Sequence, residues 1–413
     1  MSTQAKPALS LTDAVFIGAG SMIGAGLFAA FAPAAAAAGS YLFLSLALAA
    51  FLAFTNAASS AQLAAQYPAS GGTYLYGKKQ LGHFPGFMAG WCFVVGKTAS
   101  CAAMALTFAT YAAPAWQKPV AVAAVLALTA VNYRGITRTA TLTKVLVTLV
   151  LLGVLVFLVA AGAGVEPAVS AQKVSVEPGF YGVLQGAGLL FFAFAGYARI
   201  ATMGGEIKDP VRNIPRAIIL TLSLVLLLYA LVAGVLVGRL GIPQLAGAPA
   251  PLAAAVGSSP LLVGVVSFSA ALAALGALLA LITGIGRTGQ TMAAAGDLPA
   301  FFAPLHPVYG SPARFEVTLA LAVCCLILLC DLRAAIGFSS FGVLLYYFIA
   351  NISAYTQVKS QRRYPRWLQV AGAAGCFITV WTLPPSSLAT GLLLLAAGAI
   401  FYLVYARKKG NRS

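Results

Sequence analysis

The sequence predicts an all-helical membrane protein with twelve transmembrane helices. Hydrophobic residues make up 61% of its 413 residues and charged residues only 8%, whereas about a quarter of a soluble domain is charged. Apolar runs of about twenty residues, the length that crosses a bilayer, recur along the whole chain. The expected spans are residues 12–38, 41–65, 84–113, 119–134, 139–164, 180–205, 214–240, 260–286, 314–330, 334–356, 366–383 and 387–406.

The basic residues follow the positive-inside rule. The net charge of +17 would by itself also suit a nucleic-acid-binding protein. With a cytoplasmic N-terminus and alternating spans, however, 19 of the 25 Lys and Arg residues fall on the cytoplasmic side and 4 on the other. This bias orients a multi-pass protein, and its basic side faces the anionic inner leaflet. We therefore expect a protein of the cytoplasmic membrane with both termini inside, the lipid bilayer as its surroundings and no nucleic-acid partner.

The spans divide into two halves that begin alike. The first span contains a glycine-rich stretch at residues 18–26, and the sixth contains another at 196–205. Since five spans is an odd number, the second half would be inverted across the membrane, with a binding site between the matched, interrupted helices. We expect a five-plus-five inverted repeat with broken helices 1 and 6, formed by residues 1–170 and 171–360. Helices 11 and 12 and a basic cytoplasmic tail follow in residues 361–413.

The glycine-rich stretches allow two interpretations. Gly20 and Gly24 form a small-x-x-x-small pair, which lets neighbouring helices pack closely. Alternatively, each stretch is an unwound helix centre. Free N–H groups at the start of a second half-helix would then attract a carboxylate, and free carbonyls around residues 191–196 would attract an ammonium. Together, the two breaks would form a receptor for an α-amino acid.

Motifs along nearly the whole chain resemble the amino acid–polyamine–organocation superfamily of transporters. The matching segments are residues 18–28 (GAGSMIGAGLF), 67–76 (YPASGGTYLY), 86–91, 191–196 (FFAFAG), 206–216 (EIKDPVRNIPR), 287–299 and 306–312. Each motif alone is weak, but their joint order and spacing are specific. The resemblance implies the inverted-repeat fold and amino acid transport by alternating access.

The resemblance also implies where the substrate binds. It assigns the binding residues to the two breaks: Ser21, Met22, Ala25, Gly26, Phe192, Ala195 and Gly196. The N–H groups of Ala25 and Gly26 would bind the substrate carboxylate. The carbonyls of Met22, Phe192 and Ala195 would accept hydrogen bonds from its ammonium, and the Phe192 ring would close over it.

Lys97 lies inside the third span, where a charge is a functional candidate by default. Helical spacing puts Phe93, Lys97, Cys101 and Met104 on one helix face, which the resemblance assigns to the pocket for the substrate side chain. There the ammonium would repel cationic amino acids and would be a candidate for coupling transport to protons. The alternative is a lysine that lines a wet vestibule or snorkels to the membrane surface.

Charges near the sixth span suggest an inner gate. Arg199 is a second coupling candidate, which either pairs with Glu206 or lines the inner vestibule. Glu206, Asp209 and Arg212 follow the span, and we expect them to form salt bridges that help close the gate. A purely solvated loop is the alternative.

Several positions bear on ion coupling. Ala198 stands where many members of the superfamily carry an acid, and Val150 stands where some place a coupling lysine; Lys144 lies a turn and a half earlier. A sodium site between spans 1 and 8 usually draws on hydroxyl groups in the middle of span 8. That stretch, residues 270–282, has no Ser or Thr, and bare carbonyls alone are poor ligands for sodium. We therefore expect sodium-independent transport.

Together, these features predict a secondary transporter, either a permease or an exchanger, of neutral α-amino acids. Acidic amino acids or another amine or organocation are the alternative substrates. A membrane-embedded enzyme would need acids or histidines clustered within spans, but all eight acids lie at span ends or in loops, and no repeated polar ring suggests a channel. The six cysteines are interpreted as packing residues. We expect no cofactor and no metal, and the oligomeric state stays open.

Overall fold

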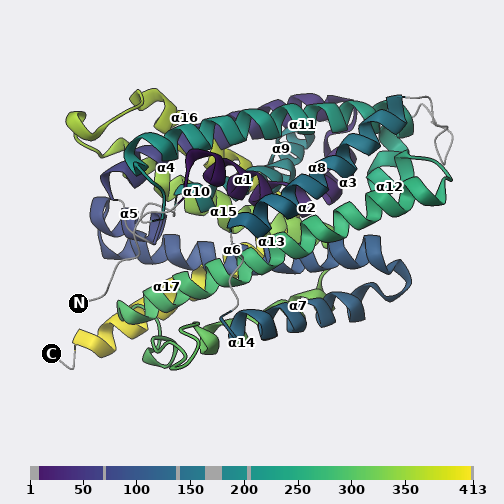
Figure 1. The fold of residues 1–413 in the computed structure, drawn as a ribbon. Helices are drawn as coiled ribbons and strands as arrows, with labels where there is room; N and C mark the ends of the chain where they lie inside the picture. The colour runs from purple at the N-terminus through teal and green to yellow at the C-terminus, as the bar shows by residue number, and fades with distance from the viewer. Residues whose placement is uncertain (1–8, 68–70, 136–139, 163–178, 202–205, 411–413) are drawn as a thin grey trace.

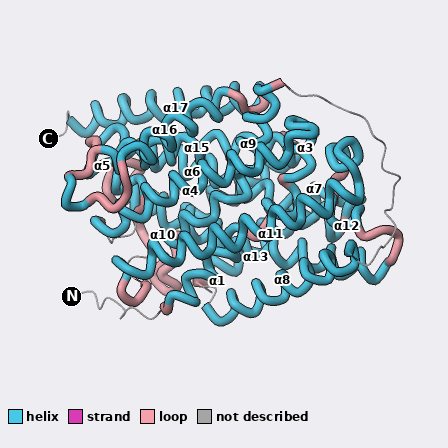
Figure 2. The backbone as a smooth tube through the Cα atoms, turned by 90° about the horizontal axis from the view of Figure 1, so that it is seen from above, coloured by secondary structure: helices cyan, strands magenta, loops and turns pink. Residues whose placement is uncertain are grey.

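The computed structural model describes residues 9–67, 71–135, 140–162, 179–201 and 206–410. Within these ranges the chain is almost entirely helical, apart from one isolated bridge between Leu9 and Ile207. The long helices run roughly side by side between the end of the molecule that carries both termini and the opposite end (Figures 1 and 2). Among the residues that the structure describes, ten helical stretches are long and apolar enough to cross a membrane. The chain is therefore a multi-pass membrane protein.

Each predicted span overlaps a helix. The helices are α1 Leu11–Met22, α2 Ala25–Ala29, α3 Phe31–Ala38, α4 Leu42–Gln66, α5 Thr73–Gln80, α6 His83–Ala112, α7 Gln117–Tyr133, α8 Ala140–Gly162, α9 Phe180–Phe194, α10 Ala198–Ala201, α11 Pro210–Gly247, α12 Pro251–Ala255, α13 Pro260–Ala294, α14 Ala313–Leu329, α15 Leu332–Tyr355, α16 Arg366–Trp381 and α17 Pro385–Gly410. Short 3-10 turns include Ala195–Tyr197. Because α14 and α16 have 17 and 16 residues, they are shorter than the ten spanning stretches, and the count of twelve stays a prediction.

Both glycine-rich stretches interrupt a helix. The helix α1 starts at a capping box formed by Ser10 and Asp13 and ends at Met22. Ile23 and Gly24 leave helical geometry, Gly24 with φ −128° and ψ −136°, before α2 begins. In the sixth predicted span, α9 ends at Phe194 and a 3-10 turn leads into α10. The first half of each predicted span is thus separated from the second by a few residues whose backbone groups need other partners.

The two breaks pack directly against each other, and glycine makes this possible. A Cβ atom on Gly196 would lie 2.3 Å from the carbonyl oxygen of Ser21, and one on Gly26 would lie 2.5 Å from Cα of Ala193. Neither neighbour can move aside, because both are backbone atoms. The glycine-rich stretches therefore combine both features: they interrupt their helices, and they allow neighbouring segments to pack closely.

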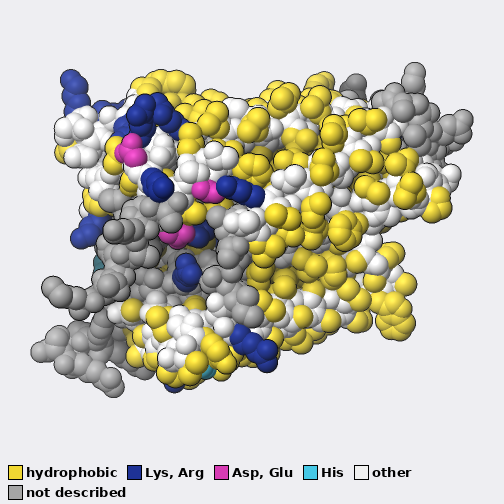
Figure 3. Space-filling model, in the orientation of Figure 1, with side chains coloured by type: hydrophobic (Ala, Val, Ile, Leu, Met, Phe, Trp, Pro, Cys, Tyr) yellow, Lys and Arg dark blue, Asp and Glu magenta, His cyan; other side chains and the backbone are white. Residues whose placement is uncertain are grey.

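The remaining helices surround the paired breaks. The helix α6 packs along α13 and α15. The helix α4 contacts α9, and α11 contacts α3. At one edge, α7 lies beside α14 (Figure 1). Stacked rings of Phe87, Trp91 and Phe401 hold α17 against α6. On the face shown in Figure 3, charged side chains gather toward the end with both termini, and much of the remaining surface is apolar.

The chain around the start of α1 is tied to the segment after α10. The Leu9 N–H donates to the Glu206 carbonyl at 3.0 Å, and the Lys208 N–H donates to the Leu9 carbonyl at 2.9 Å. The Lys144 ammonium lies 2.6 Å from the Asp13 carboxylate and so links α8 to α1. On the side of the molecule that carries the termini, these contacts join α1 to the segment after α10 and to α8.

We predict that Gly196→Ala destabilises the protein because the added methyl group pushes the two breaks apart. Overpacking of this kind costs roughly 1–3 kcal/mol, and thermal unfolding in detergent should show a clearly lower melting temperature. The matched control is Gly234→Ala in α11, where an added Cβ meets no atom within 4 Å and alanine is the better helix former. Equal melting temperatures of the two variants would contradict the proposed close contact.

Candidate functional site

A cavity of about 470 Å³ lies against the two breaks and reaches toward the end that carries the termini. Its walls come from α1, α6, the α9–α10 break and α13. Nine residues that the sequence analysis singled out line it: Ser21, Phe93, Lys97, Met104, Phe192, Ala195, Gly196, Arg199 and Glu206. Residues far apart in the sequence thus meet in one space, which is large enough for an amino acid.

Other predicted residues do not reach the cavity wall. Met22, Ala25 and Gly26 are buried behind it, within the packed break. Cys101 is fully buried and is not part of the wall; the prediction that its side chain faces the pocket is wrong, and Ser100 lines the cavity instead. The reason is helix phase, since the residues three and four positions after Lys97 lie on opposite flanks of it.

The α13 wall was missed from the sequence. It contributes a mostly small or polar surface: Ala277, Ala280, Leu281, Gly284, Ile285, Arg287, Thr288, Gln290 and Thr291. Its spacing of small residues is a signal that sequence reasoning could have used, because small residues let a helix approach its neighbours or border a cavity.

Carbonyl groups at the α9 break accept hydrogen bonds from side chains of other helices. The Lys97 ammonium donates to the Ala195 carbonyl at 3.3 Å. The buried Tyr229 hydroxyl, on α11, lies 3.0 Å from the Ala193 carbonyl and 2.8 Å from the Met22 carbonyl, so that one donor bridges both breaks. Tyr229 was not singled out from the sequence, because nothing local distinguishes it from a packing residue.

At the first break, one N–H group has a partner from another helix. The Ala25 N–H, an expected carboxylate donor, points at the Met104 thioether at 3.1 Å. Met104 lies on α6, two helical turns after Lys97, and its side chain is part of the cavity wall. A thioether is a weak acceptor, so a carboxylate would be a stronger partner for the same N–H group.

The charges that border the cavity are mostly positive. Lys97, Arg199 and Arg287 line it together with a single acid, Glu206. The Arg199 guanidinium lies 3.5 Å from the Glu206 carboxylate, so Arg199 both pairs with the acid and lines the vestibule. Asp209 and Arg212 are exposed and form no ion pair with another described residue. The predicted gate salt bridges are therefore limited to one pair here.

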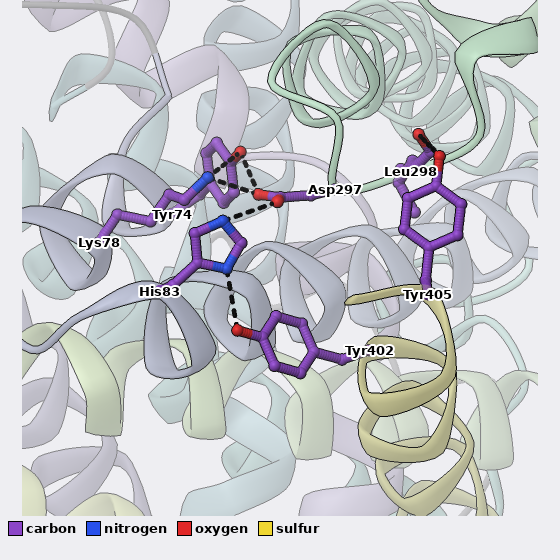
Figure 4. Close-up of polar contacts among 7 residues, drawn as sticks. All are labelled: Tyr74, Lys78, His83, Asp297, Leu298, Tyr402 and Tyr405. Atoms are coloured by element: carbon purple, nitrogen blue, oxygen red, sulfur yellow. Dashed lines mark hydrogen bonds and ion pairs between the residues drawn. The ribbon is translucent and has the colours of Figure 1, made fainter. Parts of the chain in front are cut away.

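A second polar cluster lies outside the cavity (Figure 4). The Asp297 side chain is only 3% exposed. It accepts from the Lys78 ammonium and the Tyr74 hydroxyl, each at 2.6 Å, and lies 3.0 Å from His83 Nε2. The other ring nitrogen of His83 contacts the Tyr402 hydroxyl at 3.0 Å. Burial and the neighbouring Asp297 carboxylate raise the pKa of the Tyr74 hydroxyl, which keeps it a donor. Four separate segments are joined at this point.

Comparison with known proteins shows what the chain resembles. A family model described as amino acid permease matches residues 9–407. An uncharacterized transporter of Mycobacterium tuberculosis is 54% identical over 398 residues, which cover 95% of this chain and 90% of the relative. The branched-chain amino acid permease BcaP of Bacillus subtilis is 25% identical, covering 98% and 94%. The low-affinity putrescine importer PlaP of Escherichia coli is 28% identical, covering 84% and 82%.

We predict that Asp297→Asn lowers stability because it removes the charge that three donors share. Loss of such buried, charge-assisted hydrogen bonds costs roughly 1–3 kcal/mol, measured as a lower melting temperature in detergent. Asp209→Asn is the matched control: Asp209 is exposed and has φ 48°, a left-handed conformation that Asn tolerates well. A variant Asp297→Asn that melts with the wild type would show that the cluster adds no stability.

Proposed function

The chain belongs to the amino acid permease family, and we propose that it is a secondary transporter that moves neutral α-amino acids across the cytoplasmic membrane. One observation carries the proposal: two interrupted helices meet beside a cavity that Ala195 lines, with the Ala25 N–H directly behind the Met104 side chain in the cavity wall. We further propose twelve spans, an inverted repeat of residues 1–170 and 171–360, cytoplasmic termini, and alternating access of the cavity to each side. The matches to named transporters support a carrier rather than an enzyme.

In the proposed complex, each end of the amino acid meets one break. The Met104 side chain, which lines the cavity and accepts from the Ala25 N–H, moves aside, so that the buried N–H groups of Ala25 and Gly26 take the carboxylate. The carbonyls around Ala195 take the ammonium, favoured by the negative end of the α9 dipole. The Phe192 ring, which lines the cavity, covers the substrate.

Charge in the cavity supports discrimination by side chain. When the substrate ammonium takes the Ala195 carbonyl, the Lys97 ammonium moves toward the substrate side chain. Two like charges about 5 Å apart at an effective dielectric near 20 repel by roughly 3 kcal/mol, a factor above one hundred in affinity. Arginine, lysine and diamines are therefore poor substrates. The excess of Lys97, Arg199 and Arg287 over Glu206 makes acidic amino acids the second candidate.

A small space beside Gly20, between α1, α8 and α13, is apolar. Gly20 and Ile23 border a space of about 10 Å³ together with Val147, Val150 and Ala273. The Ser269 hydroxyl donates to the Val265 carbonyl of its own helix at 2.8 Å and is not directed at this space. We propose sodium-independent transport, with protons as the candidate coupling ion and with Lys97 and Arg199 as the candidate coupling residues.

Uptake into liposomes tests the function. Purified protein should accumulate labelled leucine or alanine, or else glutamate, at least about a hundredfold better in kcat/KM than arginine, lysine or putrescine. Lys97→Ala should narrow this difference by about tenfold or more, because it removes the repelling charge. Lys79→Ala, which changes an exposed lysine of α5, is the matched control.

Two outcomes would contradict this assignment. If no labelled amino acid is taken up by protein that is folded and inserted, the chain is not an amino acid carrier. If arginine competes as well as leucine does against wild-type protein, Lys97 does not face the substrate side chain.

Replacement of external sodium by choline provides an independent test. We predict the same initial uptake rate in both buffers, because the apolar space beside Gly20 offers no oxygen ligands beyond backbone carbonyls. The measurement uses the best substrate of the panel at a concentration below its KM. A rate that collapses in choline would place a sodium site in the structure after all.

A further inference from the structure

We infer that the Lys97 ammonium takes the place of the substrate ammonium in the empty transporter, so that the protein carries out net transport and is not restricted to exchange. The inference rests on the proposed function, and it concerns how the unloaded carrier returns. Its basis is that four backbone groups of the two breaks, the Ala25 N–H and the carbonyls of Met22, Ala193 and Ala195, have side-chain partners within the protein.

The contact at Ala195 carries the inference. Its carbonyl lies where α9 ends and the 3-10 turn Ala195–Tyr197 begins, so the chain itself offers it only the poorer i→i+3 bond of that turn. The Lys97 ammonium reaches this carbonyl at 3.3 Å, and the residue is only 7% exposed. A lysine that merely lined a wet vestibule would extend into the cavity, but Lys97 is directed at the same carbonyl to which the α-ammonium of an amino acid is assigned.

The neighbouring backbone groups are satisfied as well. The Tyr229 hydroxyl contacts the carbonyls of Ala193 and Met22. The Met104 thioether accepts from the Ala25 N–H. Lys97 and Met104 both lie on α6, seven residues apart, so one helix supplies a partner to each break. Among these groups, the Ala195 carbonyl has the most strongly polar partner.

Alternating access gives this arrangement its consequence. A carrier that changes sides passes through an occluded state, in which water no longer reaches the binding site. Without substrate and without Lys97, the buried Ala195 carbonyl would then have no donor beyond its own 3-10 turn, and the loss of the side-chain hydrogen bond lowers the population of that state by roughly tenfold to a hundredfold. Such a carrier returns only when loaded, and it therefore exchanges. Because Lys97 supplies the missing donor, the empty carrier can return.

Efflux from liposomes distinguishes the two modes. Proteoliposomes are loaded with labelled L-leucine, or with L-glutamate if the panel shows that acidic amino acids are moved. They are diluted either into substrate-free buffer, which reports net efflux, or into excess unlabelled substrate, which reports exchange. For the wild type we expect net efflux within about threefold of the exchange rate. Lys97→Met keeps the chain length but removes the donor, and it should lower the ratio of net efflux to exchange by about tenfold or more.

Two further variants complete the design. Lys97→Gln retains a hydrogen-bond donor without the charge, so it should restore much of the ratio that Lys97→Met loses. Lys79→Met, at an exposed position of α5, should leave the ratio unchanged. Retained exchange shows that a variant is folded. If Lys97→Met loses exchange as well, its ratio of net efflux to exchange has no meaning. The same ratio measured for the wild type and for Lys97→Gln then tests the inference.

Each outcome separates the inference from the proposed function. Wild-type exchange without net efflux overturns the inference and leaves amino acid transport intact. An unchanged ratio in Lys97→Met also overturns it, because the ammonium is then not the partner that matters. An absence of both exchange and net efflux from wild-type protein overturns the proposed function and the inference together.

Discussion

Within a bilayer, every backbone N–H and carbonyl group needs a partner from the protein, because no water is available to supply one. A continuous helix meets this requirement on its own, whereas a broken helix does not. The interruptions at Ile23–Gly24 and after Phe194 therefore determine much of what surrounds them. Tyr229, Lys97 and Met104 come from two other helices to satisfy the freed groups. The cavity lies where these partners and the breaks meet.

Glycine also helps the backbone groups of the two breaks to find partners. Partners can reach the freed groups only if the two breaks lie close together, and Gly196 and Gly26 permit this approach because neither has a side chain. The same residues that weaken the helix thus allow its interruption to be stabilised from outside. This explains why a packing interpretation and a binding interpretation could both be drawn from one stretch of sequence.

Much of the fold was predictable because hydropathy and span length are local properties. The superfamily resemblance is confirmed by the family match over residues 9–407, and the predicted spans overlap helices. The site was only partly predictable. Motifs predicted Ser21, Phe192 and Gly196, which line the cavity, whereas Tyr229 and the α13 wall depend on how distant helices pack, and Cys101 lies off the wall because of a small difference in helix phase. Buried Asp297 was likewise missed, because its partners lie about two hundred residues away.

The bridge between Leu9 and the segment after α10 has a consequence for sequence comparison. Its two hydrogen bonds join main-chain atoms only, so almost any pair of residues other than proline can occupy these positions without breaking the link. Substitutions at residue 9 then place no demand on residues 206–208. A search for correlated substitutions among homologues would therefore pass over a contact that joins the start of α1 to the segment after α10.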